Sequence, residues 1–233
     1  MKHALITGAS GGIGYATASL FGRMGFTVHT VSRRACDLPG VQHHRMDLLE
    51  PGAVEHVSES IRDVLFEGDT LCVVHNAAVM DLDTAYAFEA DRFNAVMHIN
   101  VTVPALLTAQ LLPHMGVGSS IIYIGSTLSE KGVASRLSYV TSKHAIVGLM
   151  RATVQDLHGK GVHAVCVCPG FTDTEILRPV FDAHPEFEKI IRDKVSFGRL
   201  IAPEEIADVI YYAATHPVLN GAVLHANLGQ RET

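Results

Sequence analysis

The chain has 233 residues and a mass of 25.1 kDa, enough for one large domain with a substantial core. An apolar fraction of 48% against a charged fraction of 18% excludes a disordered chain. The net charge of −6 argues against a phosphate-backbone binder, which needs a basic face, so we expect no nucleic-acid partner.

Short apolar runs alternate along the chain with longer amphipathic stretches. Most of the runs are apolar throughout, which is typical of strands covered on both faces. The predicted strands are His3–Thr7, Thr27–Ser32, Gln42–Met46, Thr70–His75, Ser120–Gly125, Val162–Cys168 and Ala222–His225. The amphipathic stretches predict helices over Gly12–Met24, Ala53–Phe66, Ala90–Met115, Ser138–His158 and Glu204–Thr215. This alternation predicts an α/β fold, a Rossmann-like doubly wound parallel sheet of about seven strands in a single domain over residues 1–233.

Other features limit where the protein acts and what it binds. The uninterrupted apolar runs are too short for a membrane span, and the N-terminal run is too short for a signal peptide, so we expect a cytoplasmic protein. Cys166 and Cys168 stand two apart in a predicted strand and are expected to be small core residues on one face. The fourteen histidines are scattered without ligand spacing, so we predict no metal site.

A glycine-rich turn, TGASGGIG, follows the first predicted strand at residues 7–14. Glycines allow a positive φ and the close approach of a phosphate, and the next helix points its free N–H groups at the same spot. The spacing is T-G-x-x-x-G-x-G rather than G-x-G-x-x-G. Its place between a strand and an amphipathic helix favours dinucleotide binding over an ordinary turn.

The end of the second predicted strand bears on the choice of cofactor. An NAD site usually has Asp or Glu there to accept hydrogen bonds from the ribose hydroxyls. This chain has Ser32, Arg33 and Arg34 instead. Arginine is suited to bidentate phosphate contact, so the sequence favours NADP(H) over NAD(H). The alternative is that Arg33 and Arg34 lie on a solvated surface and contact no ligand.

Tyr139 and Lys143 stand at i and i+4, which places a phenol and an ammonium on one helix face. An isolated phenol is a poor acid–base catalyst near neutral pH, and a neighbouring cation favours its phenolate. The pair alone is a common surface pattern. However, Ser126 ends a predicted strand upstream of it, and Asn100 lies within a long predicted helix.

Together these motifs resemble the short-chain dehydrogenase/reductase family over roughly residues 3–229. The resemblance implies hydride transfer between a nicotinamide and a ketone, aldehyde or secondary alcohol, with a 3-oxoacyl thioester as one candidate. Tyr139 would be the general acid in reduction and the base in oxidation, and Lys143 would favour its phenolate and hold the nicotinamide ribose. Ser126 would hydrogen-bond the substrate oxygen, and Asn100 would hold a water of a proton relay.

The resemblance also assigns the residues after several strands to the cofactor. The glycine turn would surround the pyrophosphate and the adenosine ribose, the segments after the third and fourth strands would meet the adenosine, and the segment after the sixth would frame the carboxamide. With the arginines and the catalytic pair, the expected cofactor set is Gly8, Ser10, Gly12, Ile13, Gly14, Ser32, Arg33, Arg34, Asp47, Leu48, Asn76, Ala77, Tyr139, Lys143, Pro169, Gly170, Thr172 and Thr174.

The chain departs from the family pattern at three places. Ala78 stands where a glycine is usual, Gly125 stands where a serine often precedes the catalytic one, and residues 226–230 differ from the usual C-terminal motif. Thr127 offers a second hydroxyl beside Ser126, which is the preferred candidate.

The family further implies a substrate lid, here at about residues 171–199, and a homo-oligomer, a dimer or tetramer packed through its long helices. The expected partners are therefore a small carbonyl or alcohol substrate and further copies of this chain, with no membrane. Two alternatives remain: an NAD-dependent alcohol dehydrogenase of the same family, and a dinucleotide-binding regulator without catalysis. A regulator would usually lack the tyrosine or lysine, and this chain keeps both.

Overall fold

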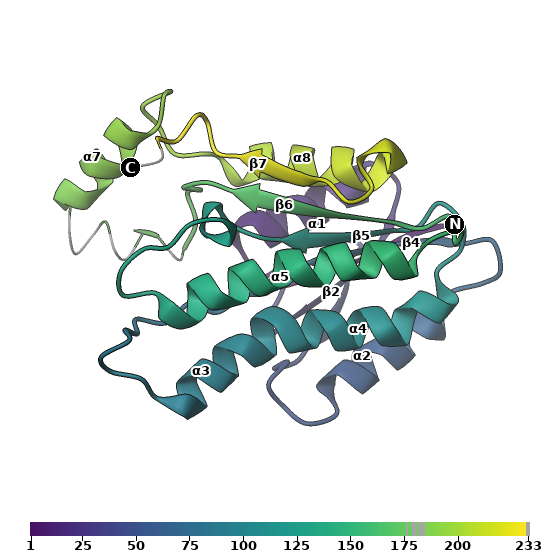
Figure 1. Ribbon diagram of the computed structural model, residues 1–233. Coiled ribbons are helices and arrows are strands. Elements are labelled where there is room, and N and C mark those ends of the chain that lie inside the picture. Colours follow the sequence, from purple (N-terminus) through teal and green to yellow (C-terminus); the bar gives the residue numbers. More distant parts are fainter. Residues whose placement is uncertain (176, 179–180, 182–184, 232–233) are drawn as a thin grey trace.

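The computed structural model describes residues 1–175, 177–178, 181 and 185–231. Seven parallel strands form one sheet in the order β3-β2-β1-β4-β5-β6-β7, so the chain reverses its direction of winding between β1 and β4 (Figure 1). The strands are β1 (Lys2–Thr7), β2 (Thr27–Ser32), β3 (Gln42–Arg45), β4 (Thr70–His75), β5 (Ser120–Ile124), β6 (His163–Pro169) and β7 (Val223–Ala226). This reversal is the place where doubly wound sheets bind their ligands, at the carboxyl ends of the strands.

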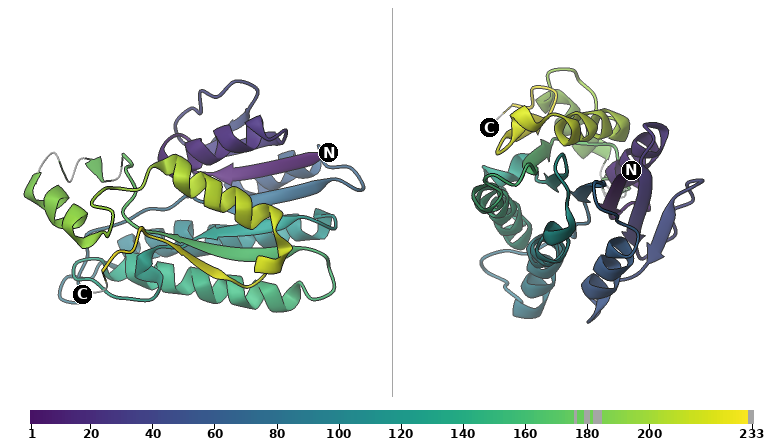
Figure 2. Two further views of the ribbon diagram at one scale, coloured as in Figure 1. Left: turned by 90° about the horizontal axis from the view of Figure 1, so that it is seen from above. Right: turned by 90° about the vertical axis from the view of Figure 1, so that its right-hand side faces the viewer.

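Helices cover both faces of the sheet, and the right-hand view of Figure 2 separates the two layers. One layer contains α1 (Gly12–Arg23) and α8 (Pro203–Thr215), which pack against each other. The other contains α2 (Ala53–Arg62), α4 (Val103–Leu111) and α5 (Leu137–Asp156). The α3 helix (Ala90–Met97) and the α7 helix (Pro185–Lys194) extend beyond the strand ends.

The strand sequences supply both cores because successive side chains point to opposite faces. Leu5 and Val73 are fully buried in the core under α2, α4 and α5, whereas Ile6 and Val74 are fully buried in the core under α1 and α8. The edge strand β3 (Gln42–Arg45) is polar and is covered less completely. The predicted parallel α/β sheet is therefore confirmed, with each of the seven strands within two residues of its predicted ends.

Two predicted helices differ from the structure. The predicted helix Ala53–Phe66 ends at Arg62, because the chain turns at Gly68 with φ +87° and the Asp69 carboxylate accepts the backbone N–H of Phe66. The predicted helix Ala90–Met115 is one helical stretch with an internal π-helical turn and a final 3₁₀ turn. By length and composition alone this stretch could span a membrane, but it packs against α2 and α5.

Two buried histidines make the stability of this fold sensitive to acid. Burial beside Thr108 lowers the pKa of His75 to about 3, and burial next to His3 lowers the pKa of His29 to about 4. The unfolded histidines take up a proton near pH 6.5, so acid favours the unfolded chain. We expect the free energy of unfolding to fall by about 1.4 kcal/mol per histidine for each pH unit below about 6.5, until the folded pKa is reached.

Urea unfolding between about pH 7 and pH 5 measures this loss. Replacing His29 with glutamine should make the fall shallower by about 1.4 kcal/mol per pH unit, because one of the two protons is no longer taken up. A free energy of unfolding that stays constant over this range would contradict the prediction.

Candidate active site at the carboxyl edge of the sheet

The glycine turn is clamped to the end of β4. Thr7 Oγ1 accepts the backbone N–H groups of Asn76 and Ala77 at 3.0 and 2.9 Å. The Asn76 amide donates to the carbonyl oxygens of Thr7 and Gly8 at 2.9 and 3.1 Å. A Cβ on Gly14 would lie 2.4 Å from the Gly8 oxygen, so α1 can begin this close to the turn only with glycine there.

These contacts give a structural role to residues predicted to touch a cofactor. The Asn76 amide holds the turn from inside, and Gly14 allows α1 to approach it. Cofactor contact by Asn76, Ala77 and Gly14 stays a prediction. Ala78 has no positive φ, so the backbone there does not require the glycine that is usual in the family.

The amino end of α1 has no side-chain cap. Its N-cap is Gly11, which provides no side-chain hydrogen bond, and no acidic residue lies in the first turn. Gly12 has φ +54°, a conformation that favours glycine. The first N–H groups of a helix have no partner within the helix and attract anions. The predicted residues Ser10, Gly12 and Ile13 lie at this end, and the arrangement fits a dinucleotide phosphate.

Two arginines stand beside this helix end. The side chains of Arg33 and Arg34 follow β2 and are 70% and 67% exposed, and Arg34 forms an exposed ion pair with Glu175. Ser32 donates from its hydroxyl to the Arg34 carbonyl at 2.8 Å and so fixes the bend after the strand. Asp47 lies 4.0 Å from the Arg33 guanidinium, and Leu48 beside it is buried. Contact of Arg33, Arg34, Asp47 and Leu48 with a cofactor stays a prediction.

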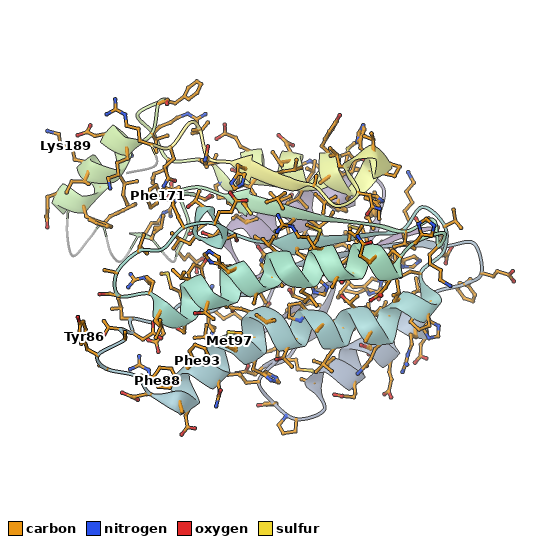
Figure 3. The ribbon with its side chains drawn as sticks, viewed as in Figure 1. Tyr86, Phe88, Phe93, Met97, Phe171 and Lys189 are labelled. Carbon is orange, nitrogen blue, oxygen red and sulfur yellow. The ribbon has the colours of Figure 1, made fainter. Side chains whose placement is uncertain are left out.

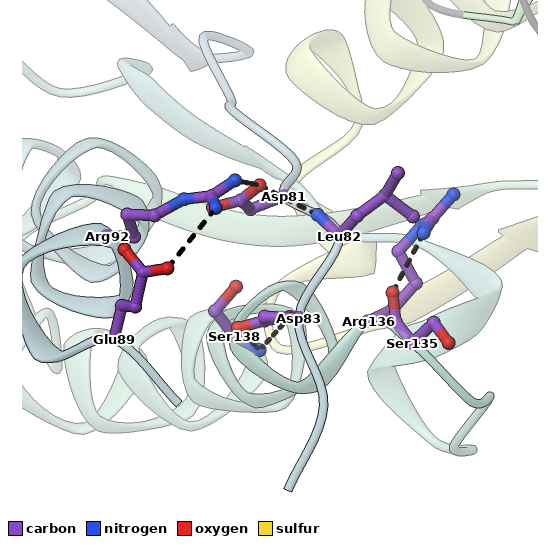
Figure 4. Close-up of polar contacts among 8 residues, drawn as sticks. All are labelled: Asp81, Leu82, Asp83, Glu89, Arg92, Ser135, Arg136 and Ser138. Carbon is purple, nitrogen blue, oxygen red and sulfur yellow. Dashed lines mark hydrogen bonds and ion pairs between the residues drawn. The ribbon is translucent and has the colours of Figure 1, made fainter. Parts of the chain in front are cut away.

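Helix α5 carries Tyr139 and Lys143, and Asp83 fixes its amino end. Both carboxylate oxygens of Asp83 accept the backbone N–H of Ser138, at 3.1 and 3.0 Å, and its carbonyl accepts that of Leu137 (Figure 4). The N-cap residue Arg136 supplies no side-chain hydrogen bond of its own. The sequence did not indicate this contact, because the two partners lie 55 residues apart and Asp83 stands in no motif.

Lys143 is buried, with 4% of its surface exposed, and its ammonium donates to the Ile124 carbonyl at 2.7 Å. Its Nζ lies 5.4 Å from the centre of the Tyr139 ring. An ammonium has three N–H donors, and the described residues accept one of them. The half-buried Tyr139 hydroxyl makes no hydrogen bond with any described residue. A phenol and two ammonium donors are thus left for ligands, which fits a substrate oxygen and ribose hydroxyls.

Ser126 is the N-cap of the 3₁₀ turn Thr127–Ser129, which packs against α5. Its Oγ accepts the backbone N–H of Leu128 at 3.1 Å, and none of the described residues accepts its hydroxyl proton. Thr127 is buried and Ser126 is half-buried, which favours Ser126 as the hydroxyl that meets a substrate.

The serine that is usual before the catalytic one does not fit at Gly125. A Cβ there would lie 2.6 Å from the Cys168 sulfur and 3.0 Å from the Cys166 sulfur. Both thiols are fully buried on the same side of β6, with their sulfurs 3.8 Å apart, as their spacing predicted. Only a residue without a Cβ leaves room at position 125 for the two cysteine sulfurs.

Asn100 lies in the π-helical turn His98–Thr102 and is 4% exposed. Its Oδ1 accepts the backbone N–H of Val79 at 2.8 Å, and its amide donates to the Val79 carbonyl and to Ser142 Oγ, both at 2.9 Å. Ser142 in turn donates to the Tyr139 carbonyl at 2.8 Å. Both amide protons are used, so Asn100 ties the loop after β4 to the helix that carries Tyr139. The predicted water relay stays a prediction.

The segment after β6 crosses towards the glycine turn. A Cβ on Gly170 would lie 2.8 Å from the Asn227 Cα, so the C-terminal segment passes directly against it, next to Pro169. Thr172 is buried and donates to the Gly170 carbonyl at 3.1 Å. The Thr174 methyl would lie 3.1 Å from a Cβ on Gly12. The segment after β6 therefore runs against the amino end of α1, and cofactor contact by Pro169, Gly170, Thr172 and Thr174 stays a prediction.

Four aromatic side chains, together with Met97 and Lys189, lie around the carboxyl edge of the sheet, called the open edge below. Phe171 and Lys189 lie on one side, and Tyr86, Phe88, Phe93 and Met97 lie on the other (Figure 3). Tyr86 is fully exposed, and the Phe88 and Phe93 rings are 5.3 Å apart. Residues 176, 179–180 and 182–184 of the predicted lid lie outside the described residues.

The described part of the predicted lid is anchored at its far end. An ion pair between Glu188 and Arg192 stabilises α7, and the helix carries most of its charges on exposed positions. The C-terminal segment pairs with the end of α7 through an isolated bridge between Val195 and Gln230. The unusual C-terminal residues 226–230 thus hold the base of this segment.

Comparisons with known proteins identify the family and the fold. Residues 2–185 match the family model for short chain dehydrogenase. The chain is 30% identical over 228 residues to dehydrogenase/reductase SDR family member 6 of Aquarana catesbeiana, covering 92% of this chain and 90% of that one. It is 27% identical over 228 residues to a 3-oxoacyl-(acyl-carrier-protein) reductase of Thermotoga maritima, covering 92% and 90%. A solved short-chain dehydrogenase/reductase from Serratia marcescens superposes with a TM-score of 0.88 at 26% identity, covering 98% and 97%.

Proposed function

The chain belongs to the short-chain dehydrogenase/reductase family, whose members act on CH–OH and C=O groups with NAD(P), and from that premise we propose that it uses NADP(H). It reduces a ketone or aldehyde, or runs the reverse oxidation of a secondary alcohol. The observation that carries the proposed chemistry is the buried Lys143 ammonium 5.4 Å from the centre of the Tyr139 ring, whose hydroxyl has no hydrogen-bond partner among the described residues.

The chain's own groups divide the reaction between them. The Lys143 ammonium binds the ribose hydroxyls and holds a positive charge near the Tyr139 ring. In reduction, the Tyr139 hydroxyl gives its proton to the substrate oxygen, and in oxidation the phenolate takes it back. The Ser126 hydroxyl donates to the same substrate oxygen and stabilises its developing charge. The cofactor, when bound, supplies or accepts the hydride.

The proposed substrates form a class of compounds rather than one molecule. The Thermotoga maritima relative is a 3-oxoacyl-(acyl-carrier-protein) reductase, and this supports a 3-oxoacyl thioester as a substrate class to test. The aromatic residues Phe171, Tyr86 and Phe88 at the open edge favour a substrate with an apolar part. By likeness to the family, we also infer that the protein forms a homo-oligomer.

Cofactor preference tests the role of the two arginines. We expect NADPH to bind more tightly than NADH, because a hydrogen bond to a charged group contributes about 1.5–3 kcal/mol, or roughly 10- to 150-fold in Kd. Replacing both Arg33 and Arg34 with glutamine should remove this difference and leave NADH affinity nearly unchanged. The chain has no tryptophan, so the emission of the reduced nicotinamide can be titrated with little interference.

Arg23→Gln is the matched control, because this exposed arginine lies in the last turn of α1, at the opposite end from the glycine turn. Tighter binding of NADH than of NADPH by the natural sequence would contradict the proposed cofactor and would support the NAD-dependent alternative.

A further inference from the structure

An ion pair joins two segments that we predict to contact the cofactor, the one after β2 and the one after β6. Glu175, in the segment after β6, accepts a hydrogen bond from the Arg34 guanidinium at 2.6 Å, and Arg34 follows β2. The two residues are 141 positions apart. The pair therefore joins the segment after β6 to the arginine that the proposed function assigns to a phosphate.

The Glu175 carboxylate also lies against the glycine turn. Its Oε1 would be 2.9 Å from a Cβ built on Gly11, the N-cap of α1. This helix end has no side-chain cap and no acidic residue in its first turn. The carboxylate thus stands between the open end of a helix and a guanidinium, the two groups that bind anions in proteins. A 2′-phosphate that bound Arg34 would meet this carboxylate.

We propose that Glu175 is a specificity-determining residue, which competes with the 2′-phosphate of the cofactor for Arg34. This inference rests on the proposed function. NADP(H) must break the Glu175–Arg34 pair to bind Arg34, whereas NAD(H) has no 2′-phosphate and can leave the pair intact. Glu175 therefore lowers the preference for NADP(H) that the two arginines create.

Backbone pairing fixes the segment just before Glu175, while the Glu175 side chain is exposed to solvent. Thr172 pairs with Ile201, and the Asp173 N–H donates to the Ile201 carbonyl at 2.9 Å. The Glu175 and Arg34 side chains are 56% and 67% exposed, and exposed ion pairs are weak. A phosphate monoester carries up to two negative charges at neutral pH and so displaces a single carboxylate without moving the backbone.

The test separates the phosphate from the rest of the cofactor by using two fragments. Adenosine 2′,5′-bisphosphate and 5′-AMP are titrated calorimetrically into the natural protein and into Glu175→Gln. We expect the variant to bind adenosine 2′,5′-bisphosphate about two- to fivefold more tightly, in line with the strength of an exposed ion pair, and 5′-AMP equally well. The gain should shrink as salt is added, because salt screens exposed charges.

Three further variants make the result specific. Glu59→Gln removes another exposed carboxylate that faces an arginine, Arg62 on α2, and should change neither affinity. In an Arg34→Gln background, Glu175→Gln should give no gain, because the contested group is gone. Glu175→Ala repeats the test without an amide that could itself contact Arg34.

A gain below twofold for adenosine 2′,5′-bisphosphate, or weaker binding, in both Glu175→Gln and Glu175→Ala overturns the inference. So does an equal gain for 5′-AMP. The proposed cofactor is judged separately, by the NADPH and NADH affinities of the natural protein. If those favour NADH while Glu175→Gln still gains affinity for the bisphosphate, the competition stands and the cofactor proposal fails.

Discussion

Replacing Tyr139 with phenylalanine is expected to lower kcat by about 10³-fold, within the range that general acid–base catalysis supplies. The substitution removes one oxygen and keeps the ring over which Lys143 lies, 5.4 Å from its centre. The hydroxyl has no partner among the described residues, so its loss leaves no internal hydrogen bond broken. NADPH affinity and the free energy of unfolding should therefore stay close to those of the natural protein.

Steady-state kinetics and cofactor titration on the same preparation measure both halves of this prediction. Tyr212→Phe is the matched control, because this exposed tyrosine lies on α8 and stacks on His216, away from the open edge. A Tyr139→Phe enzyme that kept a tenth of its kcat or more would rule out Tyr139 as the general acid. Retention of all biological activity without catalysis would favour the regulator alternative.

Replacing Lys143 with methionine is expected to lower kcat/KM by about 10³-fold or more, because two contributions are lost together. The Tyr139 side chain loses its neighbouring cation, and the cofactor ribose loses its donors. The methionine has a similar length, so the buried space stays filled. The Ile124 carbonyl loses its partner at 2.7 Å, and an unpaired buried acceptor costs about 1–3 kcal/mol.

Lys143→Met therefore differs from Tyr139→Phe in a measurable way: it should weaken NADPH binding as well as slow the reaction. Lys160→Met, at an exposed position after α5, should change neither quantity. If Lys143→Met left NADPH affinity intact and activity high, the assignment of this ammonium to the ribose and to Tyr139 would be wrong.

The fold could be predicted from the sequence because apolar runs typical of strands alternate with amphipathic stretches typical of helices along the whole chain. Apolar runs such as Thr70–His75 can be buried on both faces only in a covered parallel sheet, and the structure confirms this. The π-helical turn at Asn100 could not be predicted in this way. In this turn the Asn100 side chain hydrogen-bonds the backbone of Val79 in the loop after β4, a contact that leaves no periodic signal in the sequence.

The candidate site shows the same division. Tyr139, Lys143 and the glycine turn follow from local spacing, so the sequence indicated them. Asp83 at the amino end of α5 and Glu175 beside Arg34 act through contacts 55 and 141 residues apart. A single aspartate or glutamate in a mixed sequence carries no pattern, and only the fold brings each one to its partner.

Direct observation of hydride transfer tests the central claim most directly. NADPH carrying deuterium at the transferable C4 position would be incubated with the protein and a panel of ketones, aldehydes and an acetoacetyl thioester, and the alcohols analysed by mass spectrometry. We predict one deuterium on the carbinol carbon of at least one product, and none with Tyr139→Phe over the same time. Tight NADPH binding without label transfer to any carbonyl of the panel would contradict it and would favour a protein that binds the dinucleotide without catalysis.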